Sequence, residues 1–91
     1  MEVIWAASAL ADLKRVYLHI LESNPSAAAS ALETIQDSCL SLGSLPDRGR
    51  ISRIRARREL VFQSLPYIAV YLISKQRVEI LRIFHSAQDW P

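Results

Sequence analysis

The chain has 91 residues, 51% of them hydrophobic, and a formal net charge of +2. This length suits one domain, and the hydrophobic content favours a folded core over disorder. No apolar run approaches the roughly 20 residues that span a bilayer, and the start of the chain lacks the basic and apolar pattern of a signal peptide. We therefore expect a single domain over residues 1–91 that is cytoplasmic and does not associate with a membrane.

The charge is distributed unevenly along the chain. Residues 1–46 hold five acids against two bases, a balance of −3, whereas residues 47–91 hold nine bases against four acids, a balance of +5. The second half is therefore the one that we expect to face an anionic partner. The single cysteine, Cys39, cannot form an internal disulfide and is expected to be a small buried hydrophobe.

Residues 2–5 predict a short first strand. Hydrophobic residues then recur at helical spacing and predict an amphipathic helix over residues 9–23, with Ser8 as its N-cap and Asp12 in its first turn. The apolar face of this helix comprises Leu10, Leu13, Val16, Tyr17, Ile20 and Leu21.

A second helix is predicted to follow at once. Asn24 can cap it, and Pro25 suits the first helical position, where no backbone donor is required. Gly43 is a natural C-terminal cap for this helix. Because the connection is so short, the two helices must run antiparallel as a helical hairpin.

The rest of the chain predicts a loop and a set of strands. Residues 44–54, with proline, glycine and alternating arginines, predict an irregular loop. Three β-rich runs follow at 60–62, 67–73 and 78–84. The order β-α-α-β-β-β predicts an α+β fold in which the helical hairpin covers one face of an antiparallel sheet. The other face, which no helix covers, must be polar or must be an interface.

Six arginines lie within eleven residues: Arg48, Arg50, Arg53, Arg55, Arg57 and Arg58. Guanidinium groups match phosphates and carboxylates bidentately, so the run predicts a patch that binds nucleic acid or an acidic protein surface. The alternative is a solvated basic loop with a few salt bridges, for instance to Glu59. If the segment is extended, its three alternate arginines point to one side.

Arg82 lies inside an apolar strand. It either pairs with Glu59 or Glu79, or reaches a concave surface beside the arginine run. His85, just after that strand, could move a proton in RNA cleavage, although a hydrogen-bonded surface group is its more common role.

The aromatic residues also have two interpretations. Trp5, Tyr67 and Tyr71 could stack on bases, but aromatic residues at strand spacing more often pack in a core. Trp90 either marks an interface or folds back onto the sheet. Zinc-ligand spacing, a glycine-rich nucleotide loop and a nucleophile elbow are all missing from the sequence, and its acids are scattered, so we expect no metal and no cofactor.

The order and spacing of the motifs together resemble the RelE/ParE superfamily of type II toxin–antitoxin toxins, in particular its ParE-like branch. The motifs that carry the resemblance are Trp5 with Ala9 and Asp12-Leu13; Asn24-Pro25 with Ala27-Ala28; Leu45-Pro46 with Gly49-Arg50; Arg58-Glu59-Leu60-Val61; Pro66-Tyr67-Ile68 with Tyr71; Val78 with Ile80-Leu81-Arg82-Ile83; and His85, Gln88 and Trp90-Pro91.

The resemblance implies a RelE-like fold and an antitoxin that wraps over the helical hairpin and the sheet. RelE-like members of the superfamily cleave mRNA on the ribosome, whereas ParE-like members inhibit DNA gyrase. The sequence departs from the ribonuclease pattern, which has an arginine where Ile68 stands and a closing tyrosine that is missing after His85. It departs from the ParE-like pattern at Ala56-Arg57, where a glycine is common.

The first hypothesis is a ParE-like toxin that inhibits DNA gyrase by binding and is neutralised by a cognate antitoxin. Its target-facing side chains are predicted to be Arg50, Arg57, Arg58, Arg82, His85 and Trp90. Its antitoxin-facing side chains are predicted to be Leu13, Val16, Tyr17 and Ile20, although much of that face must also reach the core. Operator DNA is expected to be bound only through the antitoxin.

Two rival hypotheses remain open. One is a ribosome-dependent mRNA endonuclease that uses Arg58, Arg82 and His85. The other is a toxin that has lost its activity and persists as an interaction module, repressing its own operon together with its antitoxin.

Overall fold

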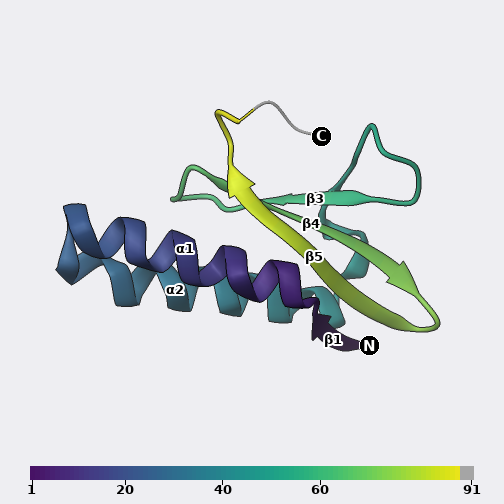
Figure 1. Ribbon diagram of the computed structural model, residues 1–91. Helices are drawn as coiled ribbons and strands as arrows, with labels where there is room; N and C mark the ends of the chain where they lie inside the picture. The colour runs from purple at the N-terminus through teal and green to yellow at the C-terminus, as the bar shows by residue number, and fades with distance from the viewer. Residues whose placement is uncertain (89–91) are drawn as a thin grey trace.

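The structure, a computed structural model, describes residues 1–88, in which two helices lie on one side of a five-stranded sheet (Figure 1). The helices are α1 (Ala7–Ser23) and α2 (Pro25–Leu40). The strands are β1 (Glu2–Trp5), β2 (Arg50–Ile51), β3 (Arg58–Val61), β4 (Tyr67–Ser74) and β5 (Arg77–His85). Two short 3₁₀ helices, η1 (Ser41–Gly43) and η2 (Pro46–Arg48), lie between α2 and β2. The predicted α+β class is confirmed.

The sheet has the strand order β1-β5-β4-β3-β2. Strands β2 to β5 pair in antiparallel fashion, whereas β1 pairs with β5 in parallel, from Glu2 opposite Arg77 to Trp5 opposite Ile80. The sheet is therefore mixed, and the expectation of a purely antiparallel sheet is wrong. Sequence patterns identify individual strands, but they do not contain the direction in which distant strands pair.

Strand β2 lies inside the segment 44–54 that the sequence predicts as an irregular loop. It contains only two residues, with Arg50 opposite Glu59 and Ile51 opposite Arg58. A strand this short has no alternating pattern that a sequence could reveal. The observed order is therefore β-α-α-β-β-β-β, with one edge strand more than predicted.

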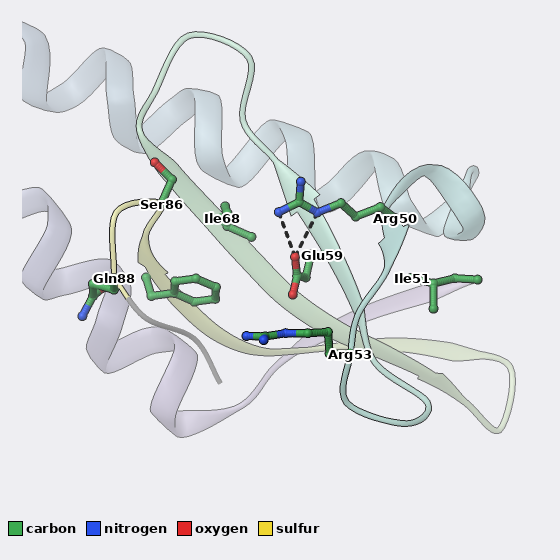
Figure 2. Close-up of a pocket in the computed structure, with 8 residues that line it drawn as sticks. Arg50, Ile51, Arg53, Glu59, Ile68, Ser86 and Gln88 are labelled. Atoms are coloured by element: carbon green, nitrogen blue, oxygen red, sulfur yellow. Dashed lines mark hydrogen bonds and ion pairs between the residues drawn. The ribbon is translucent and has the colours of Figure 1, made fainter.

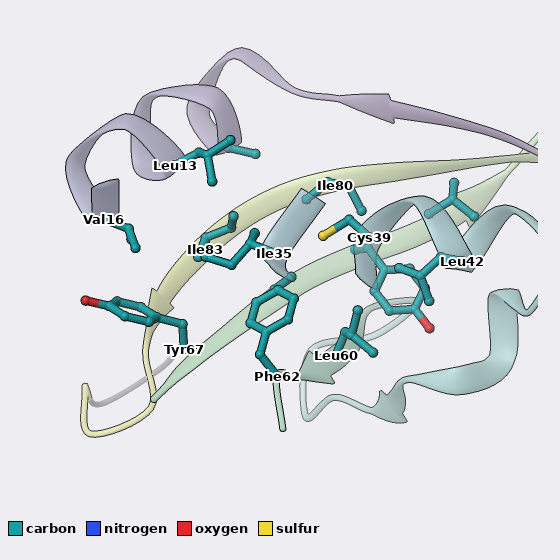
Figure 3. Close-up of a cluster of buried hydrophobic side chains, with 14 residues drawn as sticks. Leu13, Val16, Ile35, Cys39, Leu42, Leu60, Phe62, Tyr67, Ile80 and Ile83 are labelled. Atoms are coloured by element: carbon teal, nitrogen blue, oxygen red, sulfur yellow. The ribbon is translucent and has the colours of Figure 1, made fainter. Parts of the chain in front are cut away.

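Side chains from both helices and from the covered face of the sheet form the core (Figure 3). Its buried members are Ala9, Leu13, Val16, Ile35, Cys39, Leu42, Leu60, Phe62, Tyr67, Ala69, Tyr71, Val78, Ile80 and Ile83. Tyr67 and Tyr71 are thus core residues, and Trp5, partly buried, packs against the core cluster. The alternate residues Ile68 and Val70 face the other side of the sheet, where they form a small second cluster with Phe84.

Strand β5 contains a bulge that reverses its alternation. Tyr71 pairs with Ile80 and Val70 pairs with Arg82, so Leu81 has no partner on β4. A bulge of this kind turns the residues that follow it to the opposite faces. As a result, Arg82 lies beside Val70 on the face that the helices do not cover.

Helix α1 begins earlier than predicted, and Ser8 is not its N-cap. The helix starts at Ala7, after Ala6, whose side chain forms no capping hydrogen bond. Ser8 lies within the first turn, and its hydroxyl donates to the Leu81 carbonyl at 2.7 Å. The serine therefore ties α1 to β5 instead of satisfying the N–H groups of the helix.

The predicted C-terminal cap at Gly43 is also wrong. Helix α2 ends at Leu40, and Gly43 ends the following 3₁₀ helix without a positive φ. A Cβ at this position would lie 2.5 Å from the carbonyl oxygen of Met1. The glycine is therefore needed for close approach to the start of the chain, not for a left-handed cap.

A buried tyrosine fastens the loop before β2 to the sheet. The Tyr71 hydroxyl accepts a hydrogen bond from the Gly49 N–H at 2.9 Å and donates to the Pro46 carbonyl at 2.6 Å. A Cβ on Gly49 would lie 2.6 Å from both the ring and the hydroxyl of Tyr71. These contacts give the sequence motif around Pro46 and Gly49 a structural explanation.

Candidate functional site

Three of the six clustered arginines hold the protein's own backbone and side chains in place. The Nη1 of Arg48 donates to Ser41 Oγ at 2.6 Å. The Nε and Nη2 atoms of Arg50 both lie 2.9 Å from Glu59 Oε1, which joins β2 to β3. The Arg50 pair is the salt bridge to Glu59 that the sequence allowed as an alternative.

Arg58 is the third of these arginines, and it braces the loop that Tyr71 holds. Its Nη1 donates to the Gly49 carbonyl at 2.8 Å, and its Nη2 lies 3.4 Å from the Asp47 carboxylate. Arg58 pairs with Tyr71 across β3 and β4, on the side of the sheet that carries the helices. With 28% of its side chain exposed, it offers a partner little of its surface.

Residues 52–57 connect β2 and β3 as a folded turn, so the extended segment that the sequence allowed is not present. The Ser52 N–H donates to the Arg57 carbonyl at 3.0 Å, and the Arg57 N–H donates to the Ile54 carbonyl at 3.1 Å. Ala56 adopts the left-handed conformation with a φ of 65°. Glycine adopts this backbone conformation at a lower energetic cost than alanine does.

The tip of this hairpin carries the remaining arginines. Arg55 is exposed and Arg57 is half-buried, and neither guanidinium forms a hydrogen bond or an ion pair with another part of residues 1–88. Arg53 is exposed and lines the groove on the uncovered face of the sheet.

That groove has a volume of about 310 Å³ and is shown in Figure 2. Its lining residues are Arg50, Ile51, Arg53, Glu59, Ile68, Phe84, Ser86 and Gln88. Ile68 and Phe84, which are 6% and 9% exposed, form an apolar floor. Figure 2 shows Arg53 extending across the groove beside the Arg50–Glu59 pair. The uncovered face is therefore an apolar floor with a charged rim.

Arg82 pairs with Asp12 of α1, so both predicted partners, Glu59 and Glu79, are wrong. Its Nε lies 2.7 Å from Asp12 Oδ2, and its Nη2 lies 3.2 Å from Oδ1. The same carboxylate accepts a hydrogen bond from the Ile83 N–H at 2.9 Å. Because β1 pairs only with the first half of β5, Asp12 satisfies a backbone donor that a longer β1 would have bound.

Asp12 is only 1% exposed, yet its pKa is lowered. Burial by itself raises the pKa, but hydrogen bonds from Arg82, the Ile83 N–H and Arg15 outweigh that effect. Sequence reasoning placed Asp12 in the first turn as a helix-dipole residue and missed this role. The available signal was its spacing of three residues from Ala9, which places a carboxylate beside the apolar face of the helix.

His85 lies at the end of β5 on the side of the helices. Its ring meets the Tyr67 ring edge-on with centroids 5.3 Å apart, and its Nδ1 accepts a hydrogen bond from the Ala87 N–H at 3.0 Å. Together with His19 of α1, it lines a cleft of about 550 Å³ between the helical hairpin and the connection of β3 to β4.

The three residues suggested for a nuclease therefore do not share a surface. Arg58 pairs with Tyr71, and His85 pairs with Tyr67, both on the helix side. Arg82 is paired with Val70 of β4, on the face that the helices do not cover, and its guanidinium is held by the Asp12 carboxylate.

Of the predicted antitoxin-facing residues, Leu13 and Val16 are each 7% exposed and belong to the core. Ile20 packs against that core, and Tyr17 is half-buried. The exposed leucines of α1 are Leu10, Leu18 and Leu21, at 52%, 47% and 37%. The apolar face of this helix is therefore wider than the core that it covers.

Cys39 is buried as predicted, and burial raises the pKa of its thiol to about 12. Trp90 lies outside the described residues.

Within residues 1–88, no group of three or more histidine, cysteine or acidic side chains could hold a metal ion, and no helix has the length and apolar character that crossing a membrane requires.

Comparison with known proteins establishes the family. Residues 3–90 match the family described as ParE toxin of the type II toxin–antitoxin system parDE. The chain is 39% identical over 87 residues to toxin Y4kP of Sinorhizobium fredii, which covers 96% of this chain and 90% of that protein. It is 32% identical over 87 residues to toxin RelE2 of Caulobacter vibrioides, covering 96% and 97%. The chain therefore belongs to the ParE toxin family and is a toxin of a type II toxin–antitoxin system.

Solved structures agree with this assignment. A chain from the chromosomal ParDE toxin–antitoxin system of P. aeruginosa superposes with a TM-score of 0.88 at 27% identity, covering 93% of this chain and 95% of that one. A chain of the toxin–antitoxin complex RelBE2 of Mycobacterium tuberculosis superposes with a TM-score of 0.63 at 21% identity, covering 92% and 95%. The second likeness concerns the fold alone.

Proposed function

We propose that this toxin inhibits DNA gyrase by binding and carries out no chemistry of its own. The observation that carries the proposal is the separation of Arg58, Arg82 and His85 onto the two faces of the sheet. Acid–base catalysis requires that the proton donor and acceptor lie within hydrogen-bonding reach of one substrate. Side chains that occupy opposite faces, one of them salt-bridged at 2.7 Å, do not provide that arrangement.

The groove on the uncovered face supports the same proposal. Ile68, which stands where ribonuclease members carry an arginine, contributes to its apolar floor. On the rim, Glu59 neutralises Arg50 at 2.9 Å. Such a surface is suited to binding, since the groove can receive a side chain of a partner while its charged rim sets the orientation.

The target-facing set proposed from the sequence comprises Arg50, Arg57, Arg58, Arg82, His85 and Trp90. Of these, Arg50 and Arg57 are proposed to lie on the surface that meets the target. Arg50 leaves 59% of its side chain exposed, and the Arg57 guanidinium has no partner within residues 1–88. Arg58 and Arg82 are proposed to act by holding the loop and the sheet edge that present this surface.

A cognate antitoxin is proposed to bind the exposed side of α1. Leu10, Tyr17 and Leu21 follow one another at intervals of seven and four residues and therefore share one face of the helix, with Leu18 beside them. An exposed apolar stripe of this kind fits the apolar face of an amphipathic segment. The origin of a similar solved chain in the ParDE system of P. aeruginosa supports an antitoxin partner.

Two assays with purified toxin test the proposal: gyrase supercoiling, and cleavage of ribosome-bound mRNA. Supercoiling is expected to stop while mRNA stays intact. Cleaved mRNA with unaffected gyrase would establish the rival endonuclease hypothesis. The second assay is included because the chain is similar to a protein named toxin RelE2. Inactivity in both assays, together with normal growth on expression, would leave an interaction module that has lost its toxic activity.

Substitution of His85→Gln separates the two activities in living cells. If the toxin acts by binding, growth arrest on expression is expected to weaken only modestly. A nuclease that used His85 to move a proton would lose activity by roughly two to four orders of magnitude. His19→Gln is the matched control, because His19 lines the same cleft from α1.

A further inference from the structure

The tip of the β2–β3 hairpin concentrates positive charge. Residues 48–58 contain six arginines and no acid, and three of the arginines fall within residues 53–57. Figure 1 shows this connection projecting beyond the sheet, away from the two helices. Like charges held close together raise the free energy of the folded state unless an anion neutralises them.

The backbone of the tip is organised before any partner arrives. At its base, the Ser52 N–H donates to the Arg57 carbonyl at 3.0 Å, and the Ile54 N–H donates to Ser52 Oγ at 3.2 Å. Ser52 is 9% exposed, and below it the Arg50–Glu59 pair joins the two strands. Because the loop is already folded, binding orders mainly the arginine side chains.

The arginines of residues 48–58 differ in whether another group of the protein binds them. Arg48, Arg50 and Arg58 are held by Ser41, Glu59 and the Gly49 carbonyl. Arg55 and Arg57 form neither a hydrogen bond nor an ion pair with the rest of residues 1–88. These two guanidinium groups are therefore the ones available to an external anion.

The composition of the tip indicates which anion it suits. Proteins that bind single-stranded nucleic acid stack its bases on aromatic side chains, and protein interfaces centre on buried aromatic anchors. The tip, Arg53-Ile54-Arg55-Ala56-Arg57, contains no aromatic residue. Binding to the backbone of a duplex requires only positive charge and hydrogen-bond donors, which arginine supplies together.

We propose that Arg55 and Arg57 bind the phosphate backbone of duplex DNA without reading its sequence. Phosphate contacts position a protein on DNA and carry no base information, so selection of the operator remains with the antitoxin. The extension to gyrase rests on the proposed function: the toxin would contact the enzyme and its DNA substrate together.

The direct test titrates purified toxin into a fluorescein-labelled DNA duplex and follows anisotropy between roughly 50 and 200 mM salt. Each phosphate contact contributes about 0.9 to the slope of log K against log salt, so the R55Q/R57Q variant is expected to lower that slope by about 1.8. R55K/R57K keeps the charge and is expected to keep the slope. K14Q, which removes one exposed charge from α1, is the control for net charge.

Several outcomes would overturn the inference. It fails if the duplex does not bind, if R55Q/R57Q leaves the slope unchanged, or if K14Q lowers the slope as much per charge. It also fails if unlabelled single-stranded RNA displaces the toxin more readily than unlabelled duplex does. Thermal unfolding of each variant confirms that the comparison is made between folded proteins.

A supercoiling assay with the same variants separates this inference from the proposed function. If duplex binding depends on the tip but gyrase is unaffected by wild-type toxin, only the proposed function fails. If wild-type toxin inhibits gyrase while R55Q/R57Q binds duplex DNA as well as wild type does, only the inference fails.

Discussion

Asp12 connects the two layers of the molecule through one carboxylate. It accepts hydrogen bonds from the Arg82 guanidinium, the Ile83 N–H and Arg15 Nη1, at distances between 2.7 and 3.2 Å. The Asp12-Leu13 and Arg82-Ile83 motifs, which lie 70 residues apart, therefore meet at a single site. This contact explains why an apolar strand contains an arginine.

Asp12→Asn is expected to lower the free energy of unfolding by roughly 2 to 3 kcal/mol, measured by urea denaturation. The amide keeps one acceptor but loses the charge that Arg82 needs, and Arg82 is 45% exposed, which limits the loss. Arg15→Gln removes the more exposed partner, at 69% exposure, and is expected to cost less than about 1 kcal/mol. Equal losses in the two variants would contradict this ranking.

Helix α1 has two apolar surfaces that share one stretch of sequence. Leu13 and Val16 face the core, while Leu10, Leu18 and Leu21 remain exposed. Sequence periodicity predicted one apolar face that included Leu10 and Leu21 but not Leu18, and it could not divide that face, because both surfaces follow the same helical repeat. Only the position of the sheet and of α2 decides which leucines are covered.

Leu18→Glu is expected to weaken antitoxin binding at least tenfold, measured by isothermal titration calorimetry. The substitution places a charge in the proposed apolar contact, while stability is expected to change by less than about 0.5 kcal/mol at this 47% exposed position. Ile51→Glu makes the same kind of change at a 78% exposed position on β2 and is expected to leave the affinity unaltered. Similar losses from both variants would place the antitoxin elsewhere.

Sequence patterns predicted the elements more successfully than their interactions. The two helices and strands β1, β3, β4 and β5 were placed to within a few residues, because hydrophobic periodicity determines them locally. The parallel pairing of β1 with β5 and the Arg82–Asp12 bridge both join distant segments, which no local pattern reports. The burial of Leu13 and the exposure of Arg55 likewise depend on the assembled layers.

The pH dependence of stability is expected to follow Asp12. Its pKa in the folded state lies below the ordinary value of 3.8, so its ionised form stabilises the fold at higher pH. That contribution is complete above about pH 5 and is lost as the pH falls through the lowered pKa. The difference in unfolding free energy between wild type and Asp12→Asn should therefore be constant near neutrality and shrink below pH 4. A difference that grows in acid would contradict this assignment.

The interior position of β5, between β1 and β4, has a consequence for synthesis. It pairs with β1 and β4 and bonds to α1 through Ser8 and Asp12, yet the ribosome makes it after all of them. Until Arg77–His85 has emerged, β1 has no neighbouring strand and α1 has nothing to anchor it at this edge. Closing contacts over such long separations slows folding. We therefore expect a nascent chain to be harmless until Arg77–His85 has left the ribosome and paired with β1 and β4.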